Sequence, residues 1–171
     1  SRASVDKSLS RLVEAGCLVR ITNGVYMRPK INRHVGVVMT NIEEIAEIIA
    51  KSNGETLQVH GPEAVCRFKL STQVPAAAVY YTSGSSREIS VGKRKIKFIH
   101  TTTRRLQLAG TKAGAALSAL WFLGQKGISQ EITESVCNSL ESKELESLLE
   151  ANMPAWLASG VKQYAADQAH D

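Results

Sequence analysis

The side chains best suited to chemistry lie in the first thirty residues, and they are of the kind that contacts nucleic acid. Short hydroxyl groups and long cations recur at spacings of three and four residues, which places them on one face of a helix. Such groups reach phosphate oxygens and base edges. The candidate DNA-binding residues of this first set are Arg2, Ser4, Lys7, Ser8 and Arg11.

A second set of candidates follows in a segment that predicts a tight hairpin. Two short strands, residues 17–21 and 25–29, flank Thr22-Asn23-Gly24. Asn-Gly is the strongest short hairpin signal, because both residues tolerate positive φ in a type I′ turn. We expect the arginines here to bind phosphates, whereas Arg2 and Lys7 are suited to reading guanine. The candidates on the hairpin are Arg20, Asn23, Tyr26 and Arg28.

A helix over residues 1–16 must position the first set. An apolar stripe at helical spacing supports it, and Gly16 suits the position just past a helix end; the stripe consists of Val5, Leu9, Leu12 and Val13. A polar helix followed at once by a small basic hairpin is typical of the second half of a winged helix-turn-helix, which holds one helix in the major groove. The alternative is a solvated helix and hairpin at a domain edge.

A complete winged helix has two further helices before the recognition helix. Residue 1 is a serine rather than a methionine, so we expect the natural protein to extend further toward its N-terminus, unless the chain is a truncation. On either interpretation, this chain alone is expected to bind DNA weakly.

A second basic cluster lies further along the chain. It could extend the DNA footprint, hold an RNA or bind an acidic protein surface. The alternative is an exposed edge strand whose lysines prevent pairing with other chains. The cluster consists of Lys93, Arg94, Lys95, Lys97, Arg104 and Arg105.

No catalytic or metal-binding pattern is present in the sequence, so we expect neither an enzyme nor a cofactor. The four histidines are scattered, and the chain has no GxSxG, Walker or GxGxxG motif and no paired aspartates. Glu43, Glu44 and Glu63 could in principle hold a metal as in a nuclease. Acidic residues that favour the dipole at a helix N-terminus explain them more simply.

Composition indicates a globular protein with different partners at its two ends. The net charge of +5 divides into +5 for residues 1–34, +4 for residues 35–110 and −4 for residues 111–171. A basic head suits nucleic acid, while an acidic tail suits a protein partner or is a solvated helical surface. No apolar run approaches the ~20 residues of a membrane span, so we expect no membrane partner.

The cysteines are odd in number and widely spaced. Cys17, Cys66 and Cys137 form no CxxC pair, which favours a reducing cytoplasm over a disulfide framework or a zinc site. We expect all three to be small buried side chains.

The remaining pattern predicts an α+β chain with two regions: the C-terminal part of a winged helix over residues 1–32, and a mixed domain over residues 33–171. Residues 29–37 are predicted to be a linker, since they contain both Pro and Gly. A helix follows, starting at Asn41 with a capping-box pattern, carrying an apolar stripe and ending at Asn53-Gly54; the stripe is Ile42, Ile45, Ala46, Ile48 and Ile49.

Further along we expect a small antiparallel sheet and a helical C-terminal half. Residues 78–82, 87–91 and 95–100 are predicted to form an antiparallel meander with one basic face. From Thr111 onward the pattern is helical, and residues 113–123, with Trp121 and Phe122, are expected to form the core helix.

The chain resembles the AbiEi-type antitoxins over roughly residues 4–125. The resemblance rests on residues 9–16, on Arg20 with Asn23-Gly24-Val25-Tyr26 and Pro29, and on Gly61 and Ala64. It continues in Leu70-Ser71-Thr72-Gln73-Val74-Pro75, which is its most specific part, then Tyr80-Tyr81-Thr82-Ser83-Gly84, Arg87 and Lys97-Phe98-Ile99-His100. The chain departs from that family in lacking the two helices upstream of the recognition helix.

The resemblance implies an antitoxin of an AbiE-type toxin–antitoxin system. Its winged helix would repress its own operon at inverted repeats in the promoter DNA, and the second domain would help to neutralise a cognate nucleotidyltransferase toxin. Two alternatives remain open: a free-standing winged-helix regulator whose second domain senses a small ligand, and a nucleic-acid enzyme. The first needs a pocket, which nothing in the sequence marks.

Overall fold

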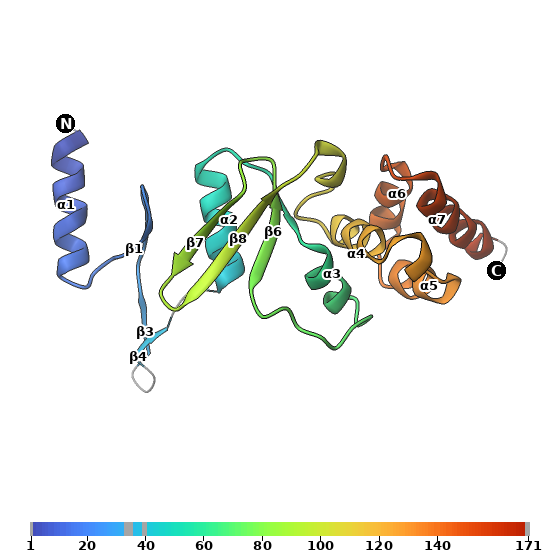
Figure 1. Cartoon of the computed structure of the whole chain (residues 1–171), viewed down its shortest axis with the longest axis horizontal. Coiled ribbons are helices and arrows are strands. Elements are labelled where there is room, and N and C mark those ends of the chain that lie inside the picture. The colour runs from blue at the N-terminus through green and yellow to red at the C-terminus, as the bar shows by residue number, and fades with distance from the viewer. Residues whose placement is uncertain (1, 33–35, 39–40, 170–171) are drawn as a thin grey trace.

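The computed structural model describes residues 2–32, 36–38 and 41–169, and within them the chain is a mixed α+β protein (Figure 1). It begins with α1 (Arg2–Glu14), which ends as predicted: Gly16 adopts φ +71, and the amide of Cys17 donates to the carbonyl of Leu12 at 2.9 Å. Residue 1, where the predicted helix begins, lies outside the described residues.

α1 extends away from the rest of the molecule (Figure 1). None of its described residues is buried, and Val5 and Leu12 of the apolar stripe are 58% and 42% exposed. Leu9 and Val13 are half-buried. The stripe therefore forms at the predicted spacing, and the described part of the chain covers it only in part.

The predicted hairpin is confirmed as β1 (Val19–Thr22) paired with β2 (Val25–Met27), but its turn is not type I′. Gly24 adopts φ +76, whereas Asn23 is not at positive φ. The register shifts between Arg20 and Thr22. Such an irregularity adds right-handed twist to the ribbon, so the hairpin closes without a mirror-image turn.

The predicted linker is wrong for the residues that the structure describes there. β3 (Lys30–Asn32) and β4 (Gly36–Val38) form a second antiparallel pair. Pro29 precedes β3 and Gly36 starts β4, positions at which neither residue interrupts the ladder. Residues 33–35, and with them the start of the predicted second domain, lie outside the described part.

The main sheet has four strands in the order β5-β6-β8-β7, and it is mixed rather than an antiparallel meander. Its strands are β5 (Leu57–Val59), β6 (Ala78–Thr82), β7 (Arg87–Val91) and β8 (Arg94–His100). β6 and β8 are parallel, because the connection after β6 carries the chain to the far edge before β8 returns between β6 and β7.

Hydrogen bonds fix that connection across the ends of the strands. Ser86 Oγ accepts from the His100 amide at 2.9 Å, and the His100 ring nitrogen Nδ1 lies 2.8 Å from the Gly84 carbonyl oxygen. Strand periodicity predicts which residues face the core, but strand order depends on such long-range contacts.

One core joins the sheet, α2 (Ile42–Ser52) and the β1–β2 hairpin. Asn41 caps α2 by accepting from the Glu43 amide, and the helix ends at Asn53-Gly54 as predicted. Ile48 was expected in the buried stripe but is 46% exposed. The shared core consists of Ile21, Val25, Ile45, Ala46, Ile49, Tyr80, Val91, Ile96 and Phe98.

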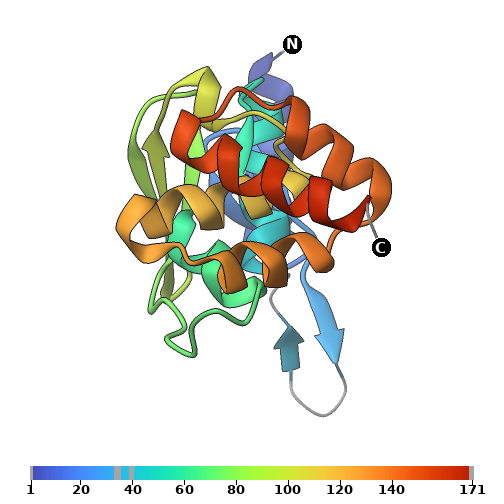
Figure 2. The ribbon, with the colours of Figure 1, turned by 90° about the vertical axis from the view of Figure 1, so that its right-hand side faces the viewer.

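The helical half is confirmed, and its helices pack on one another (Figures 1 and 2). It contains α4 (Lys112–Gly127), α5 (Gln130–Asn138), α6 (Ser142–Glu150) and α7 (Ala155–Gln168). The short α3 (Gly61–Arg67) packs on α4. A 3₁₀ turn, η1 (Thr103–Arg105), precedes α4 in the chain. α4 is buried over residues 113–120, but Phe122, expected in the core, is 49% exposed.

The cysteine expectation is wrong for two of the three residues. Cys17 is exposed and Cys66 half-buried, while Cys137 is buried. Burial raises the pKa of the Cys137 thiol to about 11, which keeps that group protonated and inert. Among the helices of the described chain, none has the length and apolar character to cross a membrane.

Candidate nucleic-acid interface

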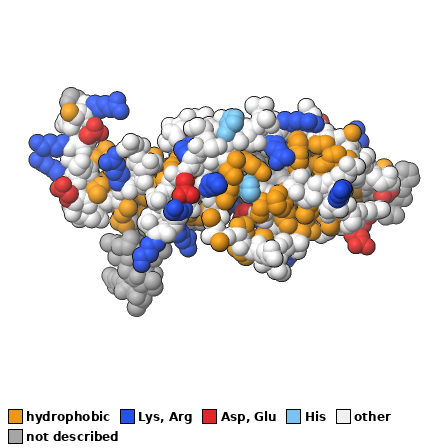
Figure 3. All heavy atoms as spheres, viewed as in Figure 1, with side chains coloured by type: hydrophobic (Ala, Val, Ile, Leu, Met, Phe, Trp, Pro, Cys, Tyr) orange, Lys and Arg blue, Asp and Glu red, His pale blue; other side chains and the backbone are white. Residues whose placement is uncertain are grey.

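The first set of predicted residues lies entirely on the surface of α1. All five side chains, Arg2, Ser4, Lys7, Ser8 and Arg11, are exposed. The hydroxyl of Ser8 donates to the Ser4 carbonyl at 3.0 Å, which leaves its oxygen free to accept. In Figure 3, Lys and Arg side chains project from this helix into solvent. The arrangement matches what a helix needs to enter a groove lined by phosphates.

One face of the hairpin is buried in the core, and the other face is exposed to solvent. Ile21 and Val25 are buried in the shared core. Arg20 lies directly opposite Tyr26 in the strand pairing, and its guanidinium donates to the Asn23 side-chain oxygen. That bond leaves the Asn23 amide group as a donor. The structure therefore brings three of the four hairpin candidates together, and Arg28 lies exposed just past β2.

The second basic cluster is spread along β8, with Lys97 in the middle of the strand and the other five residues in two groups at its ends. Lys93, Arg94 and Lys95 lie at the β7–β8 turn, on the side of the sheet where β7 contacts β1. Arg104 and Arg105 follow the other end of the seven-residue strand, about 20 Å away at ~3.3 Å per residue. Because β8 pairs on both sides, the alternative of an exposed edge strand is wrong.

Only part of the positive charge at the turn is offset. Lys95 forms an ion pair with Glu88 at 2.8 Å, and the hydrogen bond holds the pKa of Glu88 below its ordinary value. No ion pair is found for Lys93 or Arg94 among the described residues. The turn therefore adds positive charge beside the hairpin.

Sequence reasoning missed a row of rings that joins Tyr81 of β6 to His60, which precedes α3, and to Trp121 and Phe122 of α4. The ring centroids of His60 and Tyr81 lie 4.7 Å apart, and those of His60 and Phe122 lie 6.4 Å apart. The Arg105 guanidinium lies 6.0 Å from the Tyr81 ring and 5.0 Å from the Trp121 ring. These residues are scattered over residues 60–122, so no local spacing reveals them.

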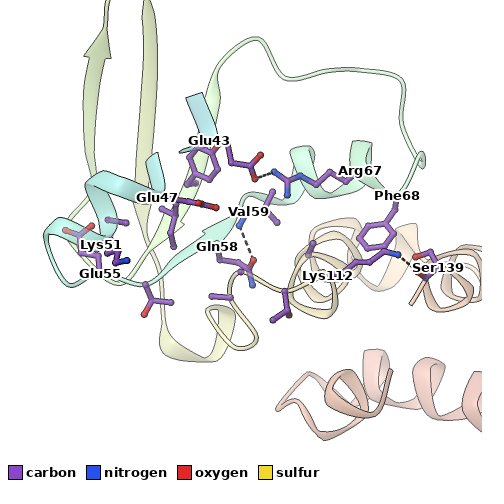
Figure 4. A pocket seen from close by; sticks show the side chains of 18 of the residues that line it. Glu43, Glu47, Lys51, Glu55, Gln58, Val59, Arg67, Phe68, Lys112 and Ser139 are labelled. Carbon is purple, nitrogen blue, oxygen red and sulfur yellow. Dashed lines mark hydrogen bonds and ion pairs between the residues drawn. The ribbon is translucent and has the colours of Figure 1, made fainter. Parts of the chain in front are cut away.

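A cavity of about 1070 Å³ lies between α2, β5 and α4 (Figure 4). Charged side chains of both signs line it, among them Glu43, Glu47, Lys51, Arg67 and Lys112. Burial, together with nearby glutamates, raises the pKa of Tyr80 in its wall to about 12. The residues that line the cavity come from several distant segments, so no local sequence pattern predicts it.

Two of the three carboxylates considered for a metal, Glu43 and Glu63, face a cation instead. Arg67 lies 2.5 Å from a Glu43 oxygen and 3.5 Å from a Glu63 oxygen. In the described ranges, no three His, Cys, Asp or Glu side chains group so as to hold a metal ion. The partners of Glu43 and Glu63 are thus those of an ion-pair cluster.

A family model described as a family of unknown function, DUF6088, matches residues 1–148. No curated protein matches the chain. No solved structure matches it.

Proposed function

Because the chain belongs to the DUF6088 family, whose function is unknown, we propose its function from the surface itself: α1 and the β1–β2 hairpin bind promoter DNA, and the protein is the autorepressing antitoxin of an AbiE-type system. The observation that carries the DNA-binding part is that the hairpin has one buried face and one exposed polar face. One face of the hairpin is anchored in the core, while the other presents Arg20, Asn23 and Tyr26. The exposed cations of α1 come directly before it in the chain.

Charge and geometry support the same surface. Residues 1–34 have a net charge of +5, and the basic turn at Lys93–Lys95 lies on the side of the sheet that contacts β1. In this arrangement α1 occupies the major groove and the hairpin lies on the backbone. The bound protein blocks access to the promoter. Neutralisation of a nucleotidyltransferase toxin is drawn from the resemblance to AbiEi-type antitoxins and involves the region after residue 33.

The test of DNA binding is the Lys7→Glu/Arg11→Glu variant, measured by fluorescence anisotropy on the DNA upstream of the gene. We expect at least about a tenfold loss of affinity, because two exposed cations that face phosphates become repulsive. The unfolding midpoint should not change, since neither side chain is buried. The matched control is Lys143→Glu/Lys162→Glu, which reverses two exposed charges in the helical half.

Salt dependence provides the outcome that would overturn the proposal. About four to six phosphate contacts per protomer predict that affinity falls by roughly 10²–10³ between 50 and 200 mM salt. Affinity that is flat over this range, or equal losses in both charge-reversal variants, contradicts binding through α1. Both readouts are ratios, so they hold even where the absolute affinity is weak.

The antitoxin part is tested by growth rescue. The neighbouring nucleotidyltransferase is co-expressed with this chain or with the Lys7→Glu/Arg11→Glu variant. Rescue by both shows that neutralisation is separable from DNA binding. Rescue by neither leaves a plain DNA-binding regulator. Point variants are preferable to a fragment beginning at residue 35. Such a fragment lacks Ile21 and Val25, which pack in the same core as α2 and the sheet.

The cavity favours a second candidate function, a winged-helix regulator that senses a small ligand. Its volume of about 1070 Å³ is at the upper end of ligand pockets. A compound that binds there raises the unfolding midpoint by mass action and shifts operator affinity. Thermal shift with a panel of charged metabolites, followed by operator binding, distinguishes this function from that of an antitoxin, which needs no such compound.

A further inference from the structure

The open face of the four-stranded sheet has an unusual composition. α2 covers one face through Ile45 and Ile49, which pack with Ile96 and Phe98 of β8. The opposite face is covered at β5, where Gln58 is buried and donates to the Gln107 carbonyl, and it is open at Tyr81 of β6 and Lys97 of β8. In Figure 3 this face shows hydrophobic side chains around a histidine, with Lys and Arg side chains on both sides.

Aromatic rings and a guanidinium group follow one another from α4 to β6 at this face. Phe122, His60 and Tyr81 form a series of rings, and Arg105 lies between the rings of Tyr81 and Trp121. The Arg105 guanidinium also lies 3.5 Å from the Tyr81 hydroxyl. Phe122 is 49% exposed, and the other rings are half-buried. Each ring thus keeps part of its surface available to a ligand.

The backbone holds Phe122 in this row. A Cβ atom on Gly61 would lie 2.3 Å from the Phe122 Cβ, so the ring rests on a position that only glycine leaves open. Arg104 is fixed from the other side, where its Nε donates to the Asn152 carbonyl at 3.2 Å and its guanidinium lies 5.3 Å from Trp121. Phe122 and Trp121 are therefore in contact with the rest of the fold before any ligand binds.

The charge of the face is positive. Within the four strands Glu88 is the only acidic residue, and it is paired with Lys95. The pKa of His60 is lowered by burial and by the nearby positive charges of Lys97 and Arg105. At neutral pH its imidazole is an uncharged ring flanked by cations.

We propose that this open sheet face binds single-stranded nucleic acid, with bases stacked on its rings and phosphates held by its cations. The platform residues are His60, Tyr81, Lys97, Arg105, Trp121 and Phe122. Bases stack on aromatic rings and on guanidinium planes with little sequence preference, while Lys and Arg follow the backbone. The cations Lys97 and Arg105 lie next to the rings, which is the combination that a strand of stacked bases and phosphates requires.

The proposal is independent of duplex binding by α1. It concerns a surface on the sheet and needs unpaired bases, whereas the helix and hairpin bind duplex DNA. The Lys7→Glu/Arg11→Glu variant is expected to keep its affinity for a single strand. Failure of either proposal therefore leaves the other standing.

The test is fluorescence anisotropy with a labelled oligo(U) of about twelve nucleotides, a length within the usual range of such sites. Phe122→Ala and Lys97→Ala are each expected to weaken binding about fivefold or more, because one removes a stacking ring and the other a phosphate contact. Both side chains are exposed, so the fold should tolerate their loss. The controls are Val74→Ala, which removes an 80% exposed apolar side chain, and Lys143→Ala.

A second readout identifies stacking directly. The chain contains two tryptophans, Trp121 and Trp156. Both border the core of the helical half, and the Trp121 ring also lies 5.0 Å from the Arg105 guanidinium. In a Trp156→Phe background, oligo(U) should quench the emission of Trp121 to saturation, whereas heparin should bind without such quenching. Binding that both platform variants leave unchanged overturns the proposal. The proposal is also overturned if the protein binds the toxin but not oligo(U), and if Phe122→Ala abolishes the binding of the toxin. The face is then a protein interface.

Discussion

Replacing Ile21 with alanine is expected to lower the free energy of unfolding by about 2–4 kcal/mol, the range for removing a buried branched side chain. Ile21 lies in the hairpin, only 9% exposed, and packs with residues of α2 and the sheet. Its loss leaves a cavity in a core that two distant parts of the chain share. Urea denaturation followed by circular dichroism measures the change.

Val5→Ala is the matched control, because Val5 is an apolar residue of α1 that is 58% exposed. Its free energy of unfolding should change by less than about 0.5 kcal/mol. We expect Ile21→Ala to shift one cooperative transition rather than create a second. Similar values for the two variants would mean that the hairpin does not belong to the same folding unit as the sheet.

Local features of the fold could be predicted from the sequence because local chemistry determines them. Asn23-Gly24 gave the hairpin, and the apolar spacing from Ile42 onward gave α2 with its end at Gly54. The strand predicted at residues 95–100 with a basic face is part of β8, in which the exposed Lys95 and Lys97 alternate with the buried Ile96 and Phe98. In each case neighbouring residues carry the whole signal.

Features that depend on distant segments could not be predicted. The order of the strands follows from contacts such as that of Ser86 with His100, and the cavity joins residues from α2 to α5. The exposure of Phe122 has a similar origin, since its partner is Gly61 on α3. The same holds for the candidate sites. Spacing identified the residues of α1 and the hairpin, whereas the row of rings, which joins β6 to α3 and α4, could not be identified from the sequence.

Replacing Glu55 with alanine is expected to lower the free energy of unfolding by about 2–4 kcal/mol, near the cost of removing one partner from a buried ion pair. Its carboxylate accepts from the Arg87 guanidinium at 2.7 Å and from the fully buried Thr82 hydroxyl at 2.9 Å. The two charged side chains are 13% and 23% exposed. Without Glu55, both donors lose their acceptor in a site that little water reaches.

The position of this ion pair explains why it matters for the fold. Gly84, whose amide donates to the Thr82 hydroxyl, leaves space for the Glu55 carboxylate, since a Cβ there would lie 2.2 Å from it. Arg87 begins β7, and its guanidinium also lies 4.4 Å from the Phe98 ring. Glu55 therefore joins the start of β5 to the connection that sends the chain to the far edge of the sheet.

A double-mutant cycle with Glu55→Gln and Arg87→Gln separates this coupling from the general cost of substitution. The coupling energy should exceed about 1 kcal/mol, because the partners are within hydrogen-bonding distance and mostly screened from water. The same cycle on Glu88 and Lys95, an exposed pair in the same sheet, should give no measurable coupling. Equal coupling in the two pairs would show that position in the sheet, rather than burial, determines the contribution of Glu55.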